Sequence, residues 1–362
     1  MRVLLVDVDC RPEIQNLALD VLSTYHKNLG HDVQLYRHLT RQKVHLNTTF
    51  QPDKIALNGT LLDKPDKVYI SSVFSWNLGI TRLLAQKFSF AEVQVGGSGY
   101  DVGVFLNKNP GKTIAQMTTS DWTTLPPGIE RLEPDYTLYG FDYAVGFCNR
   151  GCNRRCQFCI VPRKEGTIRE ERYRHPSTWV PDYMKKALLL DNDLALYPLT
   201  RQREILSWGR EAGVKLSVSQ GIDLRAVARE PEIARILAEN MPYTTAFDGK
   251  MIYGAWDYVQ NEGWIRRGIE NLLEAGIKPR YMRVYVLVGF DTTLEQDLHR
   301  CNVLWQEYKV LPFVMVYNNR KDNPWLRALA RWANKPGLIR KMDFWSYDRI
   351  PDGPPPMARP EG

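Results

Sequence analysis

Three cysteines near the middle of the chain place the strongest constraint on what it can fold around. Cys152, Cys156 and Cys159 are separated by three and then by two residues, and Phe158 directly precedes the last of them. Three thiolates on one short loop can hold a cubane iron–sulfur cluster and leave its fourth iron without a protein ligand. The spacing therefore predicts a [4Fe–4S] site with these three cysteines as ligands and with one iron open to a small molecule.

A fourth cysteine, Cys148, leaves a second interpretation open. Four thiolates can hold a tetrahedral zinc ion, and a closed site of that kind stabilises a fold without catalysing a reaction. The chain has six cysteines, and four of them lie between positions 148 and 159. This crowding is typical of a metal site in a reducing compartment and unlike the disulfide framework of a secreted protein.

Composition bounds the class of protein. The 362 residues suffice for two ordinary domains, and the hydrophobic and charged fractions of 44% and 25% are those of a globular protein. No stretch offers the run of about 20 apolar residues that spans a bilayer. The amino-terminal residues lack the basic start and the cleavage site of a secretory signal. We therefore expect a cytoplasmic protein that does not associate with membranes.

The formal net charge of +7 arises from lysines and arginines that are scattered along the chain. An excess of positive charge can attract polyanions such as nucleic acids. More commonly, it reflects a basic surface that is simply solvated. Together with the four clustered cysteines, it leaves open a metal-stabilised nucleic-acid-binding module without catalysis.

The first hundred residues alternate between strand patterns and helix patterns. Runs of β-branched residues and leucine predict buried parallel strands, and apolar positions three and four apart predict helices. We expect strands at 2–9, 32–37, 67–74 and 91–95, and helices at 14–25 and 80–88. This alternation predicts an α/β fold with a doubly wound parallel sheet, which we assign to residues 1–102.

The rest of the chain divides into three parts. Residues 103–140 contain several turns with proline and glycine and few periodic apolar positions, so we predict a connector. Residues 141–335 alternate again, with strands expected at 143–147, 187–190, 215–219, 251–255, 283–289 and 312–317. A helical stretch between successive strands predicts a partial (βα)6, TIM-like barrel, whose chemistry lies at the carboxyl ends of the strands. Residues 336–362 form a carboxyl-terminal extension.

The cysteine stretch, residues 148–159, resembles the signature of the radical S-adenosylmethionine (radical SAM) enzymes. The likeness includes the cysteine spacing, Phe158, and the residues Ile160 to Gly166 that follow. The resemblance implies that SAM binds the open iron and that one electron from the reduced cluster splits SAM to start radical chemistry. It also implies a reducing partner such as flavodoxin or ferredoxin.

The amino-terminal half is similar to the cobalamin-binding-type domain that precedes the radical SAM domain in one branch of that family. The likeness lies in Leu29 to Val33, in the strand end Ser71 to Phe74, and in Val95 to Gly97. The Asp-x-His-x-x-Gly pattern of some cobalamin proteins is missing, so cobalamin as a cofactor stays open. The resemblance makes a cobalamin-assisted methyltransferase an alternative. A methylthiotransferase needs a second cysteine-bound cluster, and Cys10 is the only cysteine before position 148.

The resemblance also implies which residues contact SAM. The backbone around Phe158 is expected to contact adenine. A Gly-Gly-Glu-like segment usually binds the SAM amino group at the second strand end, and here the sequence departs from it with Asp191, Asn192 and Asp193. The predicted cofactor-binding residues at the strand ends are Asp191, Asn192, Asp193, Ser219, Gln220, Asp223, Arg225 and Gly289.

Structural roles stay open for the same residues. Asp191 to Asp193 suit a solvated turn or helix caps, and Asp223 and Arg225 suit an internal salt bridge. The sequence predicts neither the catalytic residues nor the substrate.

Overall fold

The computed structural model describes residues 1–9, 14–38, 50–51, 54–57, 60–317 and 323–351. The chain forms two compact units. The first unit consists of Met1–Gly146, Arg154–Thr167 and His175–Met184, and the second consists of Phe147–Asn153, Ile168–Arg174 and Lys185–Gly362. The cysteine stretch therefore belongs partly to each unit. The domain ranges expected from the sequence stay predictions.

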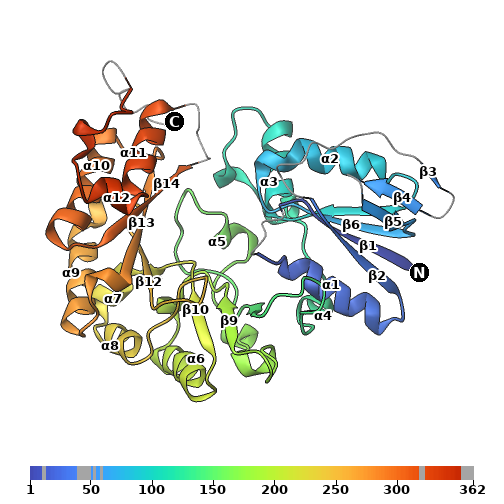
Figure 1. Ribbon diagram of the computed structural model, residues 1–362, viewed down its shortest axis with the longest axis horizontal. Coiled ribbons are helices and arrows are strands. Elements are labelled where there is room, and N and C mark those ends of the chain that lie inside the picture. The colour runs from blue at the N-terminus through green and yellow to red at the C-terminus, as the bar shows by residue number, and fades with distance from the viewer. Residues whose placement is uncertain (10–13, 39–49, 52–53, 58–59, 318–322, 352–362) are drawn as a thin grey trace. The chain divides into compact units, whose positions relative to one another are not determined.

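A four-stranded parallel sheet organises the first unit (Figure 1). Leu5 in the central strand pairs with Leu35 on one side and with Tyr69 on the other. Because both faces of this strand are covered, its sequence is an unbroken apolar run from Val3 to Val6. In spatial order the strands are β2 (Asp32–Arg37), β1 (Arg2–Asp7), β6 (Lys67–Ser71) and β7 (Glu92–Gly96).

Helices cover both faces of this sheet. Leu4 packs in a cluster with Leu84, whereas its neighbour Leu5 packs in another cluster with Leu19. Successive side chains of a strand point to opposite faces, so the two clusters are the two halves of a doubly wound core. The helices of this unit are α1 (Leu17–Asn28), α2 (Leu78–Lys87), α3 (Ser98–Lys108), α4 (Pro127–Glu130) and α5 (Val161–Lys164).

A small antiparallel sheet that the sequence did not predict also lies in the first unit. It consists of β3 (Phe50–Gln51), β4 (Lys54–Leu57) and β5 (Thr60–Asp63). The last strand of the unit, β8 (Ala144–Gly146), leads directly into the cysteine stretch.

Parallel strands also organise the second unit. β9 (Lys186–Leu189) pairs with β10 (Lys215–Val218) in one sheet. The strands of the other sheet, in spatial order, are β11 (Ile222–Asp223), β12 (Ile252–Ala255), β13 (Met282–Val288) and β14 (Leu311–Val316). Every second residue of β13 is buried, from Met282 to Val288. One face of this strand therefore supplies core, and the other face is partly open.

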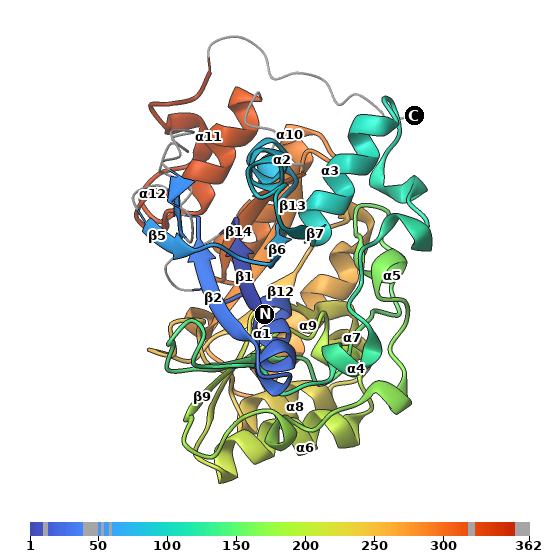
Figure 2. The same ribbon diagram turned by 90° about the vertical axis from the view of Figure 1, so that its right-hand side faces the viewer.

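The helices of the second unit pack in pairs. α7 lies against α9, and α6 lies against α8 (Figure 2). Helix α10 continues as a π-helical segment over Val303–Glu307. The bounds are α6 (Leu199–Glu211), α7 (Leu224–Arg229), α8 (Glu232–Glu239), α9 (Glu262–Glu274), α10 (Leu294–Asn302), α11 (Pro324–Ala333) and α12 (Pro336–Ile339).

The predicted mixed α/β fold with parallel sheets is confirmed. The closure of the strands into a partial barrel stays a prediction.

The range predicted as a connector, 103–140, contains the end of α3, short helical turns and α4. Of the carboxyl-terminal extension, residues 352–362 lie outside the described residues, as does Cys10. No helix among the described residues combines the length and the apolar character needed to cross a bilayer.

Candidate functional site

The three predicted ligand cysteines differ from Cys148 in exposure. Cys152, Cys156 and Cys159 are partly exposed, whereas Cys148 is fully buried. Partly exposed thiols on one loop have the donor chemistry that an iron–sulfur cluster requires. Among the residues that the structure describes, no group of three or more His, Cys, Asp or Glu side chains is arranged to hold a metal ion. The three-cysteine ligand set therefore stays a prediction.

The end of the cysteine stretch is fixed within the first unit. The Cys159 amide donates to the Cys156 carbonyl at 3.1 Å, which closes a tight turn. Arg163 donates to the Cys159 carbonyl at 2.7 Å and to the Ala115 carbonyl at 3.1 Å. Arg163 thus ties this turn to another loop of its own unit. Sequence reasoning noted Arg163 only as part of the resembling string and assigned it no contact.

The beginning of the cysteine stretch is fixed within the second unit by Asp191. The Cys148 amide lies 3.0 and 3.1 Å from the two Asp191 carboxyl oxygens, and the Asn149 amide donates to Oδ1 at 2.9 Å. The Tyr197 hydroxyl also donates to Oδ1. Burial raises the pKa of Asp191, and these donors oppose that shift. Asp191 is thus committed to the chain's own donors, and its predicted contact with SAM stays a prediction.

Further contacts within the second unit hold the same residues. The Asn149 side chain donates to the Arg169 carbonyl at 2.8 Å, and the Arg174 amide donates to the Cys148 carbonyl at 2.7 Å. The Asn192 side chain donates to the Gly151 carbonyl at 3.3 Å. Asn192 therefore touches the residue immediately before Cys152.

Burial has a large effect on the Cys148 thiol. Its pKa is raised well above the usual range, first by burial and then by the negative charge of Asp191. Burial and Asp191 also raise the pKa of the Tyr197 hydroxyl. A metal ligand must be a thiolate. The environment of Cys148 opposes that form.

The predicted polar residues at the next strand ends contact one another. Asp193 accepts from the Ala195 amide at 3.1 Å and from the Asp223 amide at 3.2 Å. Asp223 caps α7 by accepting from the Arg225 amide at 2.9 Å, and the Arg225 guanidinium lies 2.9 and 3.0 Å from its two oxygens. The structure thus brings Asp193, Asp223 and Arg225 together and contains the internal salt bridge left open by the sequence.

The remaining predicted contacts are less constrained by hydrogen bonds. Ser219 is partly buried and its carbonyl accepts from the Tyr285 hydroxyl at 2.8 Å, whereas the Gln220 side chain is exposed. Gly289 has a positive φ of 74°, and a Cβ there would lie 2.5 Å from Leu326. The positive φ favours glycine at position 289, and a Cβ there would have to displace the Leu326 side chain. Phe158 is partly buried.

Arg300 on α10 is a residue that sequence reasoning missed. It is fully buried and donates to the carbonyls of Trp256 at 2.7 Å, Asp257 at 3.0 Å and Leu287 at 2.7 Å. It also pairs with the buried Asp297 at 2.5 Å. Arg300 thereby ties the chain after β12 to the end of β13. The sequence signal for a buried Arg300 was its position on α10 next to apolar residues that face the core.

Asp257 follows β12, and its backbone carbonyl accepts from Arg300. Burial raises its pKa to about 6, and Asp223 adds to the rise, while Arg300 and Arg225 oppose it. A carboxyl group with this pKa exchanges protons near neutral pH, which suits acid–base chemistry.

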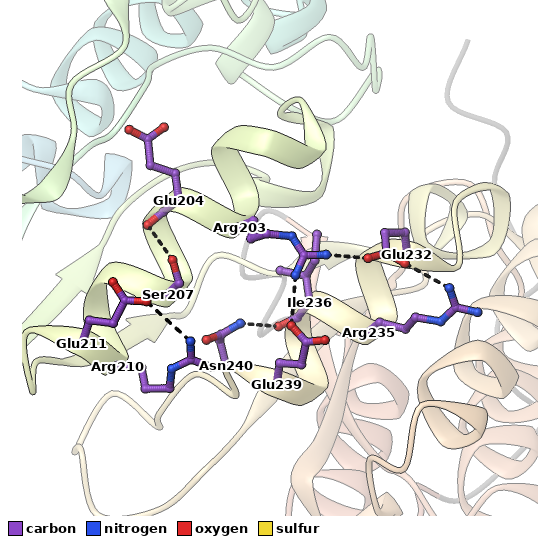
Figure 3. A network of polar contacts seen from close by, with 10 residues as sticks. All are labelled: Arg203, Glu204, Ser207, Arg210, Glu211, Glu232, Arg235, Ile236, Glu239 and Asn240. Atoms are coloured by element: carbon purple, nitrogen blue, oxygen red, sulfur yellow. Dashed lines mark hydrogen bonds and ion pairs between the residues drawn. The ribbon is translucent and has the colours of Figure 1, made fainter.

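The outer face formed by α6 and α8 is balanced in charge (Figure 3). Arg203 on α6 pairs with Glu232 at 2.5 Å and with Glu239 at 3.0 Å, and Arg235 pairs with Glu232 at 3.0 Å. Surface ion pairs of this kind contribute about 0–1 kcal/mol each. Because each of these arginines lies against a glutamate, this face does not carry the basic excess of the chain.

No protein-family model and no curated protein sequence matches the chain. Among solved structures, the fold is similar to that of an apo form of the cobalamin-dependent S-adenosylmethionine radical enzyme OxsB, with a TM-score of 0.49 and 13% identity. The match covers 83% of this chain and 51% of that one, so the chain spans about half the length of OxsB. A match at this score and identity carries no conclusion about chemistry.

Proposed function

We propose that the chain is a radical SAM enzyme whose [4Fe–4S] cluster is bound by Cys152, Cys156 and Cys159. The observation that carries this proposal is the spacing of these cysteines with Phe158, in a stretch that directly follows strand β8. When bound, the cluster and SAM would supply a 5′-deoxyadenosyl radical for chemistry on a substrate.

The residues around the stretch support this ligand set. The three thiols are partly exposed, so a cluster can reach them, while Cys148 is buried with a raised pKa. A closed four-thiolate site needs Cys148 as an additional thiolate. The nucleic-acid-binding alternative therefore requires a rearrangement around Cys148.

The proposed SAM contacts are the residues at the strand ends. Phe158 would pack against adenine, and the paired Asp223 and Arg225 would meet the polar groups of SAM. Asn192 and Asp193 offer amide and carboxylate groups to the amino group. Gly289, Ser219 and Gln220 complete the proposed set, whereas the buried Asp191 carboxylate accepts from the chain's own donors.

A cobalamin-assisted methyl transfer is the second candidate. The doubly wound parallel sheet of the first unit is the observation that favours it, because ligands of such folds bind at the carboxyl ends of the strands. Corrinoid absorbance after reconstitution would separate this candidate from a radical SAM enzyme without cobalamin.

We further propose a cytoplasmic location and a reductant such as flavodoxin or ferredoxin.

Anaerobic reconstitution of the full chain tests the main proposal. We expect about four irons per chain and release of 5′-deoxyadenosine from SAM after reduction with dithionite. Replacing any one of Cys152, Cys156 and Cys159 by serine should abolish both, whereas Cys301→Ser, in the core of the second unit, should abolish neither. A protein that binds zinc, or that takes up iron without cleaving SAM, would contradict the proposal.

A further inference from the structure

The beginning of the cysteine stretch lacks regular secondary structure, yet Cys148 and Asn149 are almost completely buried, with exposed fractions of 0% and 4%. Buried backbone amides need hydrogen-bond partners. The Asp191 carboxylate accepts from the amides of both residues at 2.9–3.1 Å. A side chain thus does here what a neighbouring strand would do in a sheet.

We propose that Asp191 is a positioning residue that anchors the backbone at Cys148 and Asn149 and keeps the Cys148 thiol sealed away from metal. The anchor stands independently of the radical SAM assignment, and its consequence for the cluster rests on the proposed function. The proposal assigns Asp191 a role different from SAM binding.

Three features of Asp191 support this role. Its side chain is fully buried, so a negative charge there is stable only with several donors around it. Those donors are the two backbone amides and the Tyr197 hydroxyl. Tyr197 also lies 3.1 Å from the Asn149 carbonyl. The tyrosine therefore contacts the anchor and the anchored residue together.

The position of Asp191 in the chain explains how the anchor acts on the ligand loop. It lies just after β9, and the next residue, Asn192, donates to the Gly151 carbonyl. Two consecutive residues thus hold three residues of the cysteine stretch up to the position before Cys152. The residues before Cys152 are therefore held at the end of β9.

Alkylation of cysteines in the metal-free full chain tests the anchor directly. In the wild-type chain we expect iodoacetamide to modify the partly exposed cysteines quickly and the buried Cys148 and Cys301 slowly. Asp191→Asn removes the charge that holds the two amides. It should raise the alkylation rate of Cys148 at least tenfold while Cys301 keeps its wild-type rate. Burial and the Asp191 charge raise the pKa of the Cys148 thiol, so part of this rise comes from the loss of that charge. The rise in Tyr197→Phe, which keeps the charge, therefore measures the opening itself.

Asp101→Asn is the matched control. Asp101 is also a buried carboxyl that holds a loop, accepting from the Thr123 amide at 3.0 Å and from its hydroxyl at 2.7 Å, but it lies in the first unit. This variant should leave Cys148 protected. Tyr197→Phe removes one donor and keeps the two amide contacts, so it should give a smaller rise. That variant also tests the anchor if Asp191→Asn does not fold.

The outcomes separate the anchor from the proposed function. An unchanged alkylation rate of Cys148 in Asp191→Asn and in Tyr197→Phe would overturn the anchor. An equal rise at Cys148 and Cys301 in Asp191→Asn would overturn it too. After reconstitution, Asp191→Asn should hold at most half the iron of the wild-type chain and show an altered EPR spectrum of the reduced cluster. If the wild-type chain takes up no iron, the radical SAM proposal fails, and the alkylation rates still decide on Asp191.

Discussion

Replacing Asp20 by asparagine should stabilise the first unit at neutral pH. Asp20 lies on α1 and is fully buried, and neither of its carboxyl oxygens has a hydrogen-bond partner among the described residues. Burial raises its pKa to about 8, and the nearby carboxyl groups of Asp135 and Asp7 add to the rise. The folded chain therefore holds a proton that the unfolded chain releases.

The sign and the size of the effect follow from this difference. An unfolded aspartate has a pKa of about 3.9, so the folded state is favoured at low pH and loses stability as the pH rises from about 4 to 8. Between about pH 4 and pH 7 the loss is roughly three pH units at about 1.4 kcal/mol each, or about 4 kcal/mol. Asparagine has a similar shape and carries no charge. Its amide group lacks a partner too, so we expect a gain of about 2–4 kcal/mol at pH 7.

Urea denaturation of both proteins at pH 5, 6, 7 and 8 measures the gain. The advantage of Asp20→Asn should be largest at pH 8 and fall to about 1 kcal/mol or less at pH 5. Asp121→Asn is a control with the opposite sign, because Asp121 accepts from the Thr118 amide at 2.7 Å and from the Thr118 hydroxyl at 2.8 Å, and these contacts lower its pKa. A variant that is no more stable than the wild-type chain at pH 8, or an advantage that does not shrink towards pH 5, would refute the reasoning.

Three further predictions concern single positions. Arg300→Met should destabilise the second unit by about 3–5 kcal/mol in urea, because it removes the ion-pair partner of the buried Asp297 and a donor to three carbonyls; adding Asp297→Leu should recover much of the loss, and no recovery would contradict this. Gly289→Ala should lower thermal stability by about 1–3 kcal/mol, since φ is positive and the new Cβ would meet Leu326; an unchanged melting temperature would contradict it. Burial lowers the pKa of His26 to about 4, so the contribution of this residue to stability should be lost as the pH falls below about 6.5; NMR should show no titration of its ring between pH 8 and pH 5.5.

The sequence predicted the parallel strands well because their residues leave few alternatives. The strand expected at 32–37 is β2 itself, and the one expected at 283–289 is β13 shifted by one residue. Buried parallel strands require near-continuous β-branched and leucine residues, and such runs are rare elsewhere in a soluble chain.

Helix α3 shows where the same reasoning was insufficient. Its sequence begins Ser-Gly-Tyr-Asp-Val-Gly, no helix was expected there, and residues from 103 onwards were predicted as a connector. In the structure a Cβ on Gly99 would lie 2.3 Å from the backbone of Phe74. The glycine therefore permits a close approach of the helix to the loop after β6. Sequence alone does not distinguish a glycine needed for packing from one needed for a turn.

The carboxylates at the strand ends present the same difficulty. The sequence correctly placed Asp191, Asn192 and Asp193 just after the carboxyl end of the strand that is β9 in the structure. A carboxylate that binds a ligand and a carboxylate that binds the chain's own amides occupy the same kind of position, because both groups meet there. Only the fold shows that Asp191 holds Cys148 and Asn149.

The contacts of Cys148 also bear on which metal site the cysteine stretch supports. A four-thiolate zinc site requires Cys148 to lose its proton and to turn towards the other cysteines. Burial and the charge of Asp191 oppose the first step, and the Cys148 amide and carbonyl are held by Asp191 and Arg174 against the second. The three other cysteines carry no comparable burial. A ligand set that uses them alone does not need Cys148 to lose its proton or to turn, and this difference favours the proposed three-cysteine site over the closed zinc site.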